Sequence, residues 1–346
     1  MRALHHWARL CLVTVLASAC GSTGPSPATV SGKPLTDPGP NDYLNQFEGG
    51  LYPGGSNSMP SAHDSVGRAR AHALQRLDTN GQPSPAGTIV LMSVGMSNAT
   101  QEWCSVAGTV CDPWTLSGKA ASDPAVNHAS LTIVNGAKGS ETADAWDSPN
   151  DPSYDRVRDN VLAPAGLTEK QVQAIWLKEA DPRPVTSLPS ASADAYHLET
   201  ELGNIVRSLK TRYTNLQLVF LSSRIFAGYA STTLNPEPYA YESGFSVKWM
   251  IGAQIDQMAN GGNVVDSRAG NLNYNSVAPW VAWGPYLWAN GNQARSDGLV
   301  WVRADFESDG THPSTAGETK VASLLLNFFK SDQHAACWFL AGGSCP

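Results

Sequence analysis

Charged residues are scarce in this sequence, and they do not gather in blocks of one sign. They make up 15% of the 346 residues, and the formal net charge is -7. Nucleic-acid-binding surfaces require clustered Lys and Arg residues, which the sequence does not contain. We therefore expect no DNA or RNA partner, whereas an apolar fraction of 42% is enough for a sizeable folded core.

Long hydrophobic runs are also missing. The apolar run at residues 10–16 is too short to cross a bilayer, and it follows the basic residues Arg2 and Arg9, which is typical of a signal peptide. The run ends in Leu-Ala-Ser-Ala-Cys at Cys20, which resembles a bacterial lipobox. The resemblance implies a signal peptide at residues 1–20, acylation of Cys20, and an exported lipoprotein of the cell envelope that is membrane-anchored only through its lipid. A plain secretory signal is the alternative.

Cysteine is rare, and no Cys-x-x-Cys motif occurs. Outside the first twenty residues, the four cysteines form two sequence-local pairs, Cys104 with Cys111 and Cys337 with Cys345. Two short-loop disulfides are the economical interpretation, and they agree with export. A metal site built from the four cysteines is the alternative, but no histidine lies at zinc-finger spacing, so we expect no metal.

The composition divides the chain into segments. Residues 21–40 are nearly all Gly, Ser, Thr, Pro and Ala, which predicts a flexible linker. Residues 41–332 contain no further low-complexity stretch and no internal repeat, which predicts one folded domain. Residues 333–346 are expected to form a C-terminal tail closed by its local disulfide.

Short apolar runs alternate with amphipathic segments in the folded region. The runs that predict buried strands lie at 88–94, 131–134, 173–176 and 216–221, and helical spacing occurs at 193–213 and 315–329. Residues 260–292 show weak periodicity and are expected to form long ordered loops. This alternation predicts an α/β fold, a three-layer α/β/α sandwich with a mostly parallel central sheet, in which ligands bind at the carboxyl ends of the strands.

Ser97 lies where the first predicted strand turns into a helix. Gly95 allows a tight turn, and the free N–H groups of a helix start can face an oxyanion. This position suits a nucleophilic hydroxyl. The alternative is that Ser97 or Asn98 only caps the helix.

A second polar segment precedes the last predicted helix. Asp309 and His312 are spaced Asp-x-x-His, so the carboxylate can reach the imidazole within one turn. A carboxylate that accepts the imidazole N–H fixes the tautomer and leaves the other nitrogen free to take a serine proton. A capping Asp309 with a surface His312 is the alternative.

Together, the Gly95-Met96-Ser97-Asn98 turn and the Asp-x-x-His-Pro segment resemble the first and last blocks of the SGNH (GDSL-like) hydrolase superfamily. The first block is similar to the Gly-Gln-Ser-Asn form of sialate O-acetylesterase-like carbohydrate esterases. The resemblance covers roughly residues 87–329. It implies that Ser97 is the nucleophile, that Asp309 orients His312, and that His312 acts as base and then as acid. It also implies a serine esterase without cofactors, which cleaves carboxylic esters of small molecules or polysaccharides, for example glycan acetates.

The same resemblance implies donors for an oxyanion hole. Gly139 and Ser140 lie in the loop that corresponds to the second block of the superfamily. The third block is matched only by Trp-Leu-Lys-Glu-Ala-Asp, which places Lys178 where the superfamily has Asn or Gln. Either Lys178 supplies the third donor or the hole has two.

Other polar and aromatic residues are candidates for substrate binding. Arg224 follows a predicted strand and could bind a carboxylate or sugar hydroxyl, and Glu242 is a second candidate, but an ion pair between the two is the alternative. Aromatic residues at 274–301 could stack on sugar rings or only pack in the core. His128 and His197 have no partner at ligand spacing.

The sequence leaves four further functions open. A non-catalytic surface-binding lipoprotein could retain this scaffold, and a lipase, an arylesterase or an acyltransferase could use the same residues. The oligomeric state is not predicted.

Overall fold

The computed structural model describes residues 30–37, 42–105 and 110–343. The predicted signal peptide and the predicted lipidation site Cys20 therefore lie outside the described residues. No helix in the described part of the chain combines the length and the apolar character needed to cross a membrane.

The centre of the molecule is a five-stranded sheet in which all neighbouring strands are parallel. The strands are β1 (Ile89–Gly95), β2 (Leu131–Asn135), β3 (Val172–Lys178), β4 (Leu218–Leu221) and β5 (Trp280–Trp283). Their order is β2-β1-β3-β4-β5, so the chain turns back between β1 and β3. Parallel α/β sheets bind ligands at the carboxyl ends of the strands beside such a reversal.

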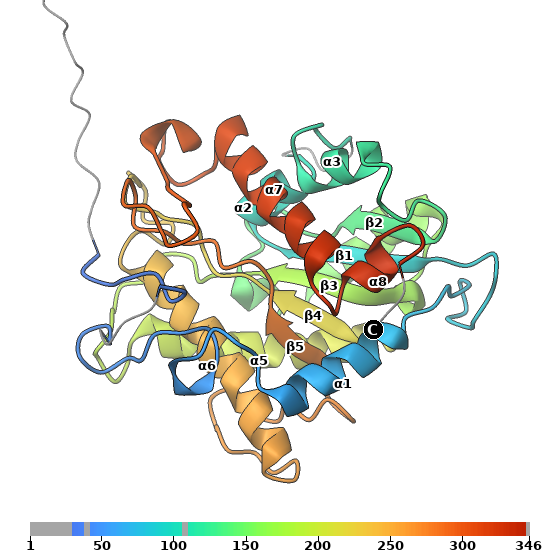
Figure 1. The fold of residues 1–346 in the computed structure, drawn as a ribbon, viewed down its shortest axis with the longest axis horizontal. Helices are drawn as coiled ribbons and strands as arrows, with labels where there is room; N and C mark the ends of the chain where they lie inside the picture. Colours follow the sequence, from blue (N-terminus) through green and yellow to red (C-terminus); the bar gives the residue numbers. More distant parts are fainter. Residues whose placement is uncertain (1–29, 38–41, 106–109, 344–346) are drawn as a thin grey trace, which may run out of the picture.

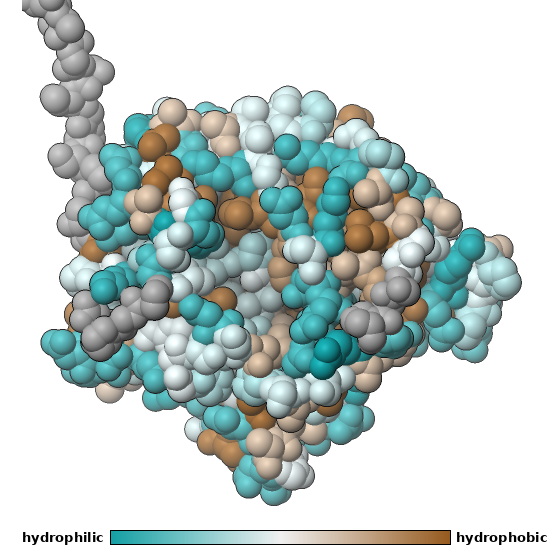
Figure 2. Space-filling model, viewed as in Figure 1, coloured by the Kyte–Doolittle hydropathy of each residue, from teal (hydrophilic) through white to brown (hydrophobic). Residues whose placement is uncertain are grey.

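Helices cover both faces of the sheet and complete the predicted three-layer α/β/α sandwich (Figure 1). One layer contains α1 (Ser61–His72), α2 (Ser97–Trp103), α3 (Leu116–Ser122), α7 (Thr315–Ser331) and α8 (Ala336–Phe339). The other layer contains α5 (Asp194–Arg212) and α6 (Tyr239–Ala259), which pack along one another. A shorter helix, α4 (Pro152–Val157), precedes β3. On the face shown in Figure 2, hydrophobic residues occur in small scattered groups among polar ones.

Four of the five strands were predicted from their apolar runs, and the sequence-based expectation is wrong for the fifth. Every residue of β1 and β3 is buried, which explains their near-continuous apolar sequence. β5 lies within the segment expected to form loops. β5 is only four residues long. It is a strand because Trp280 to Trp283 pair in register with Leu218 to Leu221 of β4.

Helix α6 has no predicted counterpart because it carries no amphipathic stripe. Most of its residues are buried, including polar ones. The polar side chains bind loop backbone: Gln254 donates to the carbonyl oxygens of Leu272 and Pro279, and Gln257 donates to the carbonyl oxygen of Gly262. A helix buried on several sides does not show the polar face that predicts a surface helix.

The predicted ends of the domain need correction. Residues 30–37 were expected to belong to a flexible linker, but Val30 and Leu35 are buried, and Asn290 Nδ2 donates to the Val30 carbonyl oxygen at 3.0 Å. At the other end, Trp338 and Phe339 of α8 are also buried. The folded domain therefore extends beyond 41–332 in both directions.

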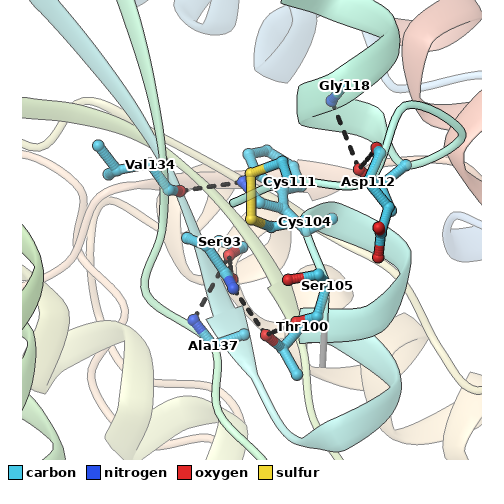
Figure 3. Close-up of a disulfide and its surroundings, with 12 residues drawn as sticks. Ser93, Thr100, Cys104, Ser105, Cys111, Asp112, Gly118, Val134 and Ala137 are labelled. Carbon is cyan, nitrogen blue, oxygen red and sulfur yellow. Dashed lines mark hydrogen bonds between the residues drawn. A yellow bond between two sulfur atoms is a disulfide. The ribbon is translucent and has the colours of Figure 1, made fainter. Parts of the chain in front are cut away.

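A disulfide joins Cys104 and Cys111, as predicted. It lies directly after α2 and close to β2, where Trp103 Nε1 donates to the Val134 carbonyl oxygen at 3.0 Å (Figure 3). The bridge therefore fixes the carboxyl end of the helix whose first residue is Ser97. Cys345 lies outside the described residues, so the pairing of Cys337 with Cys345 stays a prediction.

Candidate active site

The turn between β1 and α2 presents Ser97 at the edge of the sheet. Gly95, the last residue of β1, has φ of +154°, and a Cβ at this position would collide with the carbonyl oxygen of Lys178 on β3. Only glycine fits this turn without strain. The chain reverses at Met96, and Ser97 begins α2, so the sequence-based placement of Ser97 is correct.

His312 lies in the loop before α7, and this loop is held at several points. A backbone bridge joins Phe306 to Pro313, and the Ser231 N–H donates to the Asp309 carbonyl oxygen at 2.9 Å. Gly310 has φ of +65°, and a Cβ there would collide with the carbonyl oxygen of Tyr229. The imidazole is thus carried by a loop with little freedom to move.

Ser97, His312 and Asp309 form a continuous series of hydrogen bonds. His312 Nε2 lies 2.9 Å from Ser97 Oγ, and His312 Nδ1 lies 2.6 Å from Asp309 Oδ2, although Ser97 and His312 are 215 positions apart. Asn98 Nδ2 donates to the Thr311 carbonyl oxygen at 3.2 Å and ties α2 to the loop. These partners show that the serine and the histidine do more than cap a helix or face solvent.

The carboxylate of Asp309 is stabilised in its charged form. Partial burial raises the pKa of Asp309, but hydrogen bonds from the His312 side chain and from the N–H groups of His312 and Thr311 outweigh it, so the pKa lies below its ordinary value. A charged carboxylate favours the Nδ1–H tautomer of the imidazole and leaves Nε2 able to accept a proton from Ser97.

A cavity of about 450 Å³ opens over Ser97 and His312. Its lining comes from the ends of β1 and β3, from the loop after β2 and from the loops before α6 and α7. The residues are Met96, Ser97, Asn98, Gly139, Ser140, Thr142, Asp181, Pro182, Arg183, Arg224, Leu234, Asn235, Thr311 and His312. No aromatic side chain occurs among these described lining residues. Polar residue types predominate among these residues, although most of the surface that they expose to the cavity is apolar, and the cavity is large enough for a small acyl group and part of its alcohol.

The loop predicted to supply oxyanion donors lies beside Ser97. Gly139 and Ser140 line the cavity, and a Cβ placed on Gly139 would lie 3.7 Å from the Ser97 Cβ. The loop is tied to the sheet because the Lys138 N–H donates to the Gly95 carbonyl oxygen at 2.9 Å. Its location agrees with the resemblance, while its role as a donor stays a prediction.

Lys178 does not line the cavity, so its predicted place as an oxyanion donor needs correction. Its side chain is fully buried, and its Nζ lies 2.5 and 2.6 Å from the two carboxylate oxygens of Glu102 on α2. Burial lowers the pKa of Lys178 to about 8, against the attraction of Glu102. Lys178 therefore belongs to an internal ion pair that joins β3 to α2.

Arg224 and Glu242 do not form the ion pair that the sequence left open. Glu242 Oε1 accepts from the Tyr43 hydroxyl and Oε2 accepts from the Leu188 N–H, both at 3.0 Å. Glu242 is absent from the lining of the Ser97 cavity, and it fastens the N-terminal segment to α6. Arg224 does line the cavity. The structure therefore separates the two predicted substrate-binding residues.

The buried position of Glu242 predicts a pH dependence of stability. Burial raises the pKa of Glu242 from 4.5 to about 7, against the hydrogen bonds from Leu188 and Tyr43. Between these two pKa values, the folded state therefore binds more protons than the unfolded state. The free energy of unfolding falls as the pH rises from about 4.5 to about 7. We expect Glu242→Gln to flatten the decline of Tm between pH 5 and pH 8. Parallel Tm profiles of the two proteins would contradict this assignment.

The aromatic residues considered for sugar stacking belong to the core. Trp280, Trp283, Tyr286 and Trp288 are all at most 4% exposed, and none lines the Ser97 cavity. The packing alternative is therefore correct for these four residues.

One group of side chains could hold a metal ion, contrary to the sequence-based view of His197. Asp181, His197 and Glu201 each offer a ligand atom, and these atoms lie within 4.8 Å of one another. His197 Nδ1 lies 3.4 Å from Asp181 Oδ2 and 3.6 Å from Glu201 Oε2. This group lies close to the Ser97 cavity, because Asp181 belongs to the group and also lines the cavity. Acidic groups of this kind are common without a bound ion, so the group is no evidence of one.

Several residues of the cavity were missed in the sequence. Arg183, Leu234 and Asn235 lie in loops after β3 and before α6, and they carry no motif or regular spacing. Their common place follows from the strand order, which brings both loops to the same sheet edge. Only a prediction of that order could have found them.

Comparison with known proteins gives structural neighbours only. No family model matches the chain, and no curated protein matches its sequence. Similar solved structures include an extracellular lipase from Streptomyces rimosus, with 12% identity over 69% of this chain and 99% of that chain and a TM-score of 0.32. A protein described as an SGNH hydrolase from Slackia heliotrinireducens has 13% identity over 70% and 99%, with a TM-score of 0.33. A carbohydrate esterase family 2 enzyme from Corynascus thermopiles has 11% identity over 71% and 67%, with a TM-score of 0.34.

These three neighbours are thus a lipase, an SGNH hydrolase and a carbohydrate esterase, and none of them is a sialate O-acetylesterase. At these identities and TM-scores they carry no argument about the chemistry of this chain. The functional proposal rests on the geometry around Ser97.

Proposed function

We propose that this protein is a carboxylic ester hydrolase that uses Ser97, His312 and Asp309 as a catalytic triad. The observation that supports the proposal is the series of hydrogen bonds from Ser97 Oγ through His312 to Asp309, located at the carboxyl ends of the strands and open to a cavity. Nucleophile, base and orienting carboxylate in this arrangement can perform acyl transfer without a cofactor.

In the proposed first step, His312 Nε2 takes the proton of Ser97 as Oγ attacks the ester carbonyl carbon. The negative charge that develops on the carbonyl oxygen is stabilised by backbone N–H groups of Ser97 and of the Gly139–Ser140 turn. The C–O bond to the alcohol then breaks, and the leaving oxygen receives its proton from His312. Water activated by His312 releases the acid from the acyl-enzyme in the same way.

Small acyl esters suit the cavity best. The cavity has a volume of about 450 Å³, and the charged residues Asp181, Arg183 and Arg224 in its lining favour acetate or a similar group over a long alkyl chain. Acetyl groups on glycans fit this description, although sugar binding would use polar contacts because the described lining has no aromatic platform. Lipase, arylesterase and acyltransferase activities use the same chemistry and are distinguished by substrate.

Export and lipid anchoring are also part of the proposal. They are supported by the sequence around Cys20 and by the Cys104–Cys111 disulfide, since disulfides persist mainly in oxidising compartments.

Hydrolysis of 4-nitrophenyl esters tests the proposal. We expect turnover of the acetate to exceed that of the octanoate, and Ser97→Ala to lower kcat by about 10³-fold or more because the acyl-enzyme cannot form. Ser192→Ala, at an exposed serine of a loop, is the matched control and should match the wild type. A folded wild type that hydrolyses none of these esters would favour the non-catalytic binding alternative.

A further inference from the structure

Arg224 is a buried cation that has no partner of opposite charge in contact with it among the residues that the structure describes. The residue is 2% exposed and lines the Ser97 cavity. Within the described ranges, no carboxylate lies within 4 Å of the guanidinium. Its one side-chain hydrogen-bond contact is from Nη1 to the Met96 sulfur at 3.9 Å, and Nε has none. A guanidinium carries five N–H donors, so most of this donor set is unused by the protein.

Four carboxylates, those of Glu102, Glu237, Glu179 and Asp309, attract Arg224. Glu179 is buried, and neither of its carboxylate oxygens has a hydrogen-bond partner among the described residues. Glu102 is paired with Lys178. Glu237 accepts from the N–H groups of Ala227 and Tyr241 and from Trp288 Nε1. These carboxylates attract Arg224 from a distance without satisfying its donors.

An unpaired buried charge is expensive, so its retention needs an explanation. Within the described part of the chain Arg224 forms no ion pair at contact distance, so its charge is balanced only by carboxylates that lie farther away. The cavity that Arg224 lines explains why the charge is retained, because an anionic ligand in the cavity can bind the guanidinium away from bulk water.

We propose that Arg224 binds a carboxylate of the substrate, so that the preferred substrates are esters carrying an anionic group close to the scissile bond. This inference rests on the proposed function, which supplies the ester. A guanidinium binds carboxylate in a bidentate manner, which is stronger and more directional than a contact with a neutral hydroxyl. Acetylated uronic acids and half-esters of dicarboxylic acids share this chemistry.

The rim of the cavity supports an anionic ligand. Arg183 is exposed, lines the same cavity and has no ion-pair partner in the described residues. The one carboxylate in the lining, Asp181, lies 3.4 Å from His197 Nδ1. The lining therefore contains two guanidinium groups, those of Arg183 and Arg224, and one carboxylate, that of Asp181, which lies beside His197.

Two matched pairs of esters test the inference. The first is a methyl glucuronide acetate against the corresponding methyl glucoside acetate, which places the carboxylate on the alcohol side. The second is mono-4-nitrophenyl succinate against 4-nitrophenyl butyrate, which places it on the acyl side. We expect wild-type kcat/KM to favour the anionic member of one pair by about 10-fold or more, since a charge-assisted hydrogen bond is stronger than a contact with a neutral group.

The variants Arg224→Met and Arg224→Lys locate the cause of the preference. Met should reduce the ratio of anionic to neutral ester to near one, and Lys should restore part of it. The Tm of each variant is measured alongside, so that the ratios are compared between folded proteins. A wild type that hydrolyses the neutral esters without preference in either pair overturns the inference and leaves the proposed function intact. A preference that survives in Arg224→Met also overturns it.

A second readout separates this inference from the proposed function. Calorimetry with the non-acetylated methyl glucuronide and methyl glucoside, and with succinamate and the neutral butyramide, measures anion binding without turnover. An inactive wild type that binds an anion through Arg224 would contradict the hydrolase assignment and keep the anion site. An active wild type that binds neither anion would contradict the anion site and keep the hydrolase assignment.

Discussion

Replacing His312 by alanine lowers kcat/KM for 4-nitrophenyl acetate by about 10³- to 10⁶-fold, while the protein remains folded. The magnitude follows from the loss of the base that takes the Ser97 proton, because a serine hydroxyl without such a base is a weak nucleophile. His312 is partly exposed, and among the described residues its ring hydrogen-bonds to Ser97 and Asp309 alone. Its removal therefore costs little packing, and the Tm should change by only a few degrees.

Asp309→Asn provides the companion measurement. The amide has the size of the carboxylate but no charge, so it loses the preference for the Nδ1–H tautomer, and we expect a fall in kcat of about 10³- to 10⁴-fold. His128→Ala removes an exposed imidazole and serves as the control. Near-wild-type activity of either His312→Ala or Asp309→Asn would remove that residue from the mechanism.

The second large effect concerns stability. We expect Lys178→Met to lower the free energy of unfolding by about 3–5 kcal/mol, because it leaves Glu102 buried without its cation. The double variant Lys178→Met/Glu102→Leu should recover most of that loss, since a buried ion pair can be replaced by apolar side chains of similar volume. Urea unfolding of the two single variants and the double variant measures the coupling.

The same variants also test the alternative role of Lys178 as an oxyanion donor. If Lys178 were a donor to the substrate oxyanion, Lys178→Met would reduce kcat far more than stability, and the double variant would remain inactive. The internal position of the pair predicts instead that the folded double variant retains activity within about 10-fold of the wild type.

The two end blocks of the site were predictable because their chemistry is local. Gly95 and Ser97 lie in one turn, and Asp309 and His312 lie in another, so residue types and short spacing define each. Their meeting depends on topology: β1 leads directly into α2, and the loop before α7 returns to the same sheet edge. The alternation of apolar runs and amphipathic helices was sufficient to predict that parallel sheet.

The remaining parts depend on long-range contacts that leave little local trace. β5 is a strand because it pairs with β4, and α6 lacks a polar face because it is buried on several sides. Lys178 is the last residue of an otherwise largely apolar strand, but the position of Glu102 on α2 determines its role. Arg224 is similar, since only its surroundings show that it has no carboxylate in contact.

The most direct test is covalent labelling with a fluorophosphonate, followed by mass spectrometry of the digested protein. A hydroxyl that shares a hydrogen bond with an imidazole beside an open cavity should react, and the adduct should be found on Ser97 in the wild type, at a much lower level in His312→Ala and not in Ser97→Ala. A folded wild type that stays unlabelled, or that is labelled at another serine, would contradict the account.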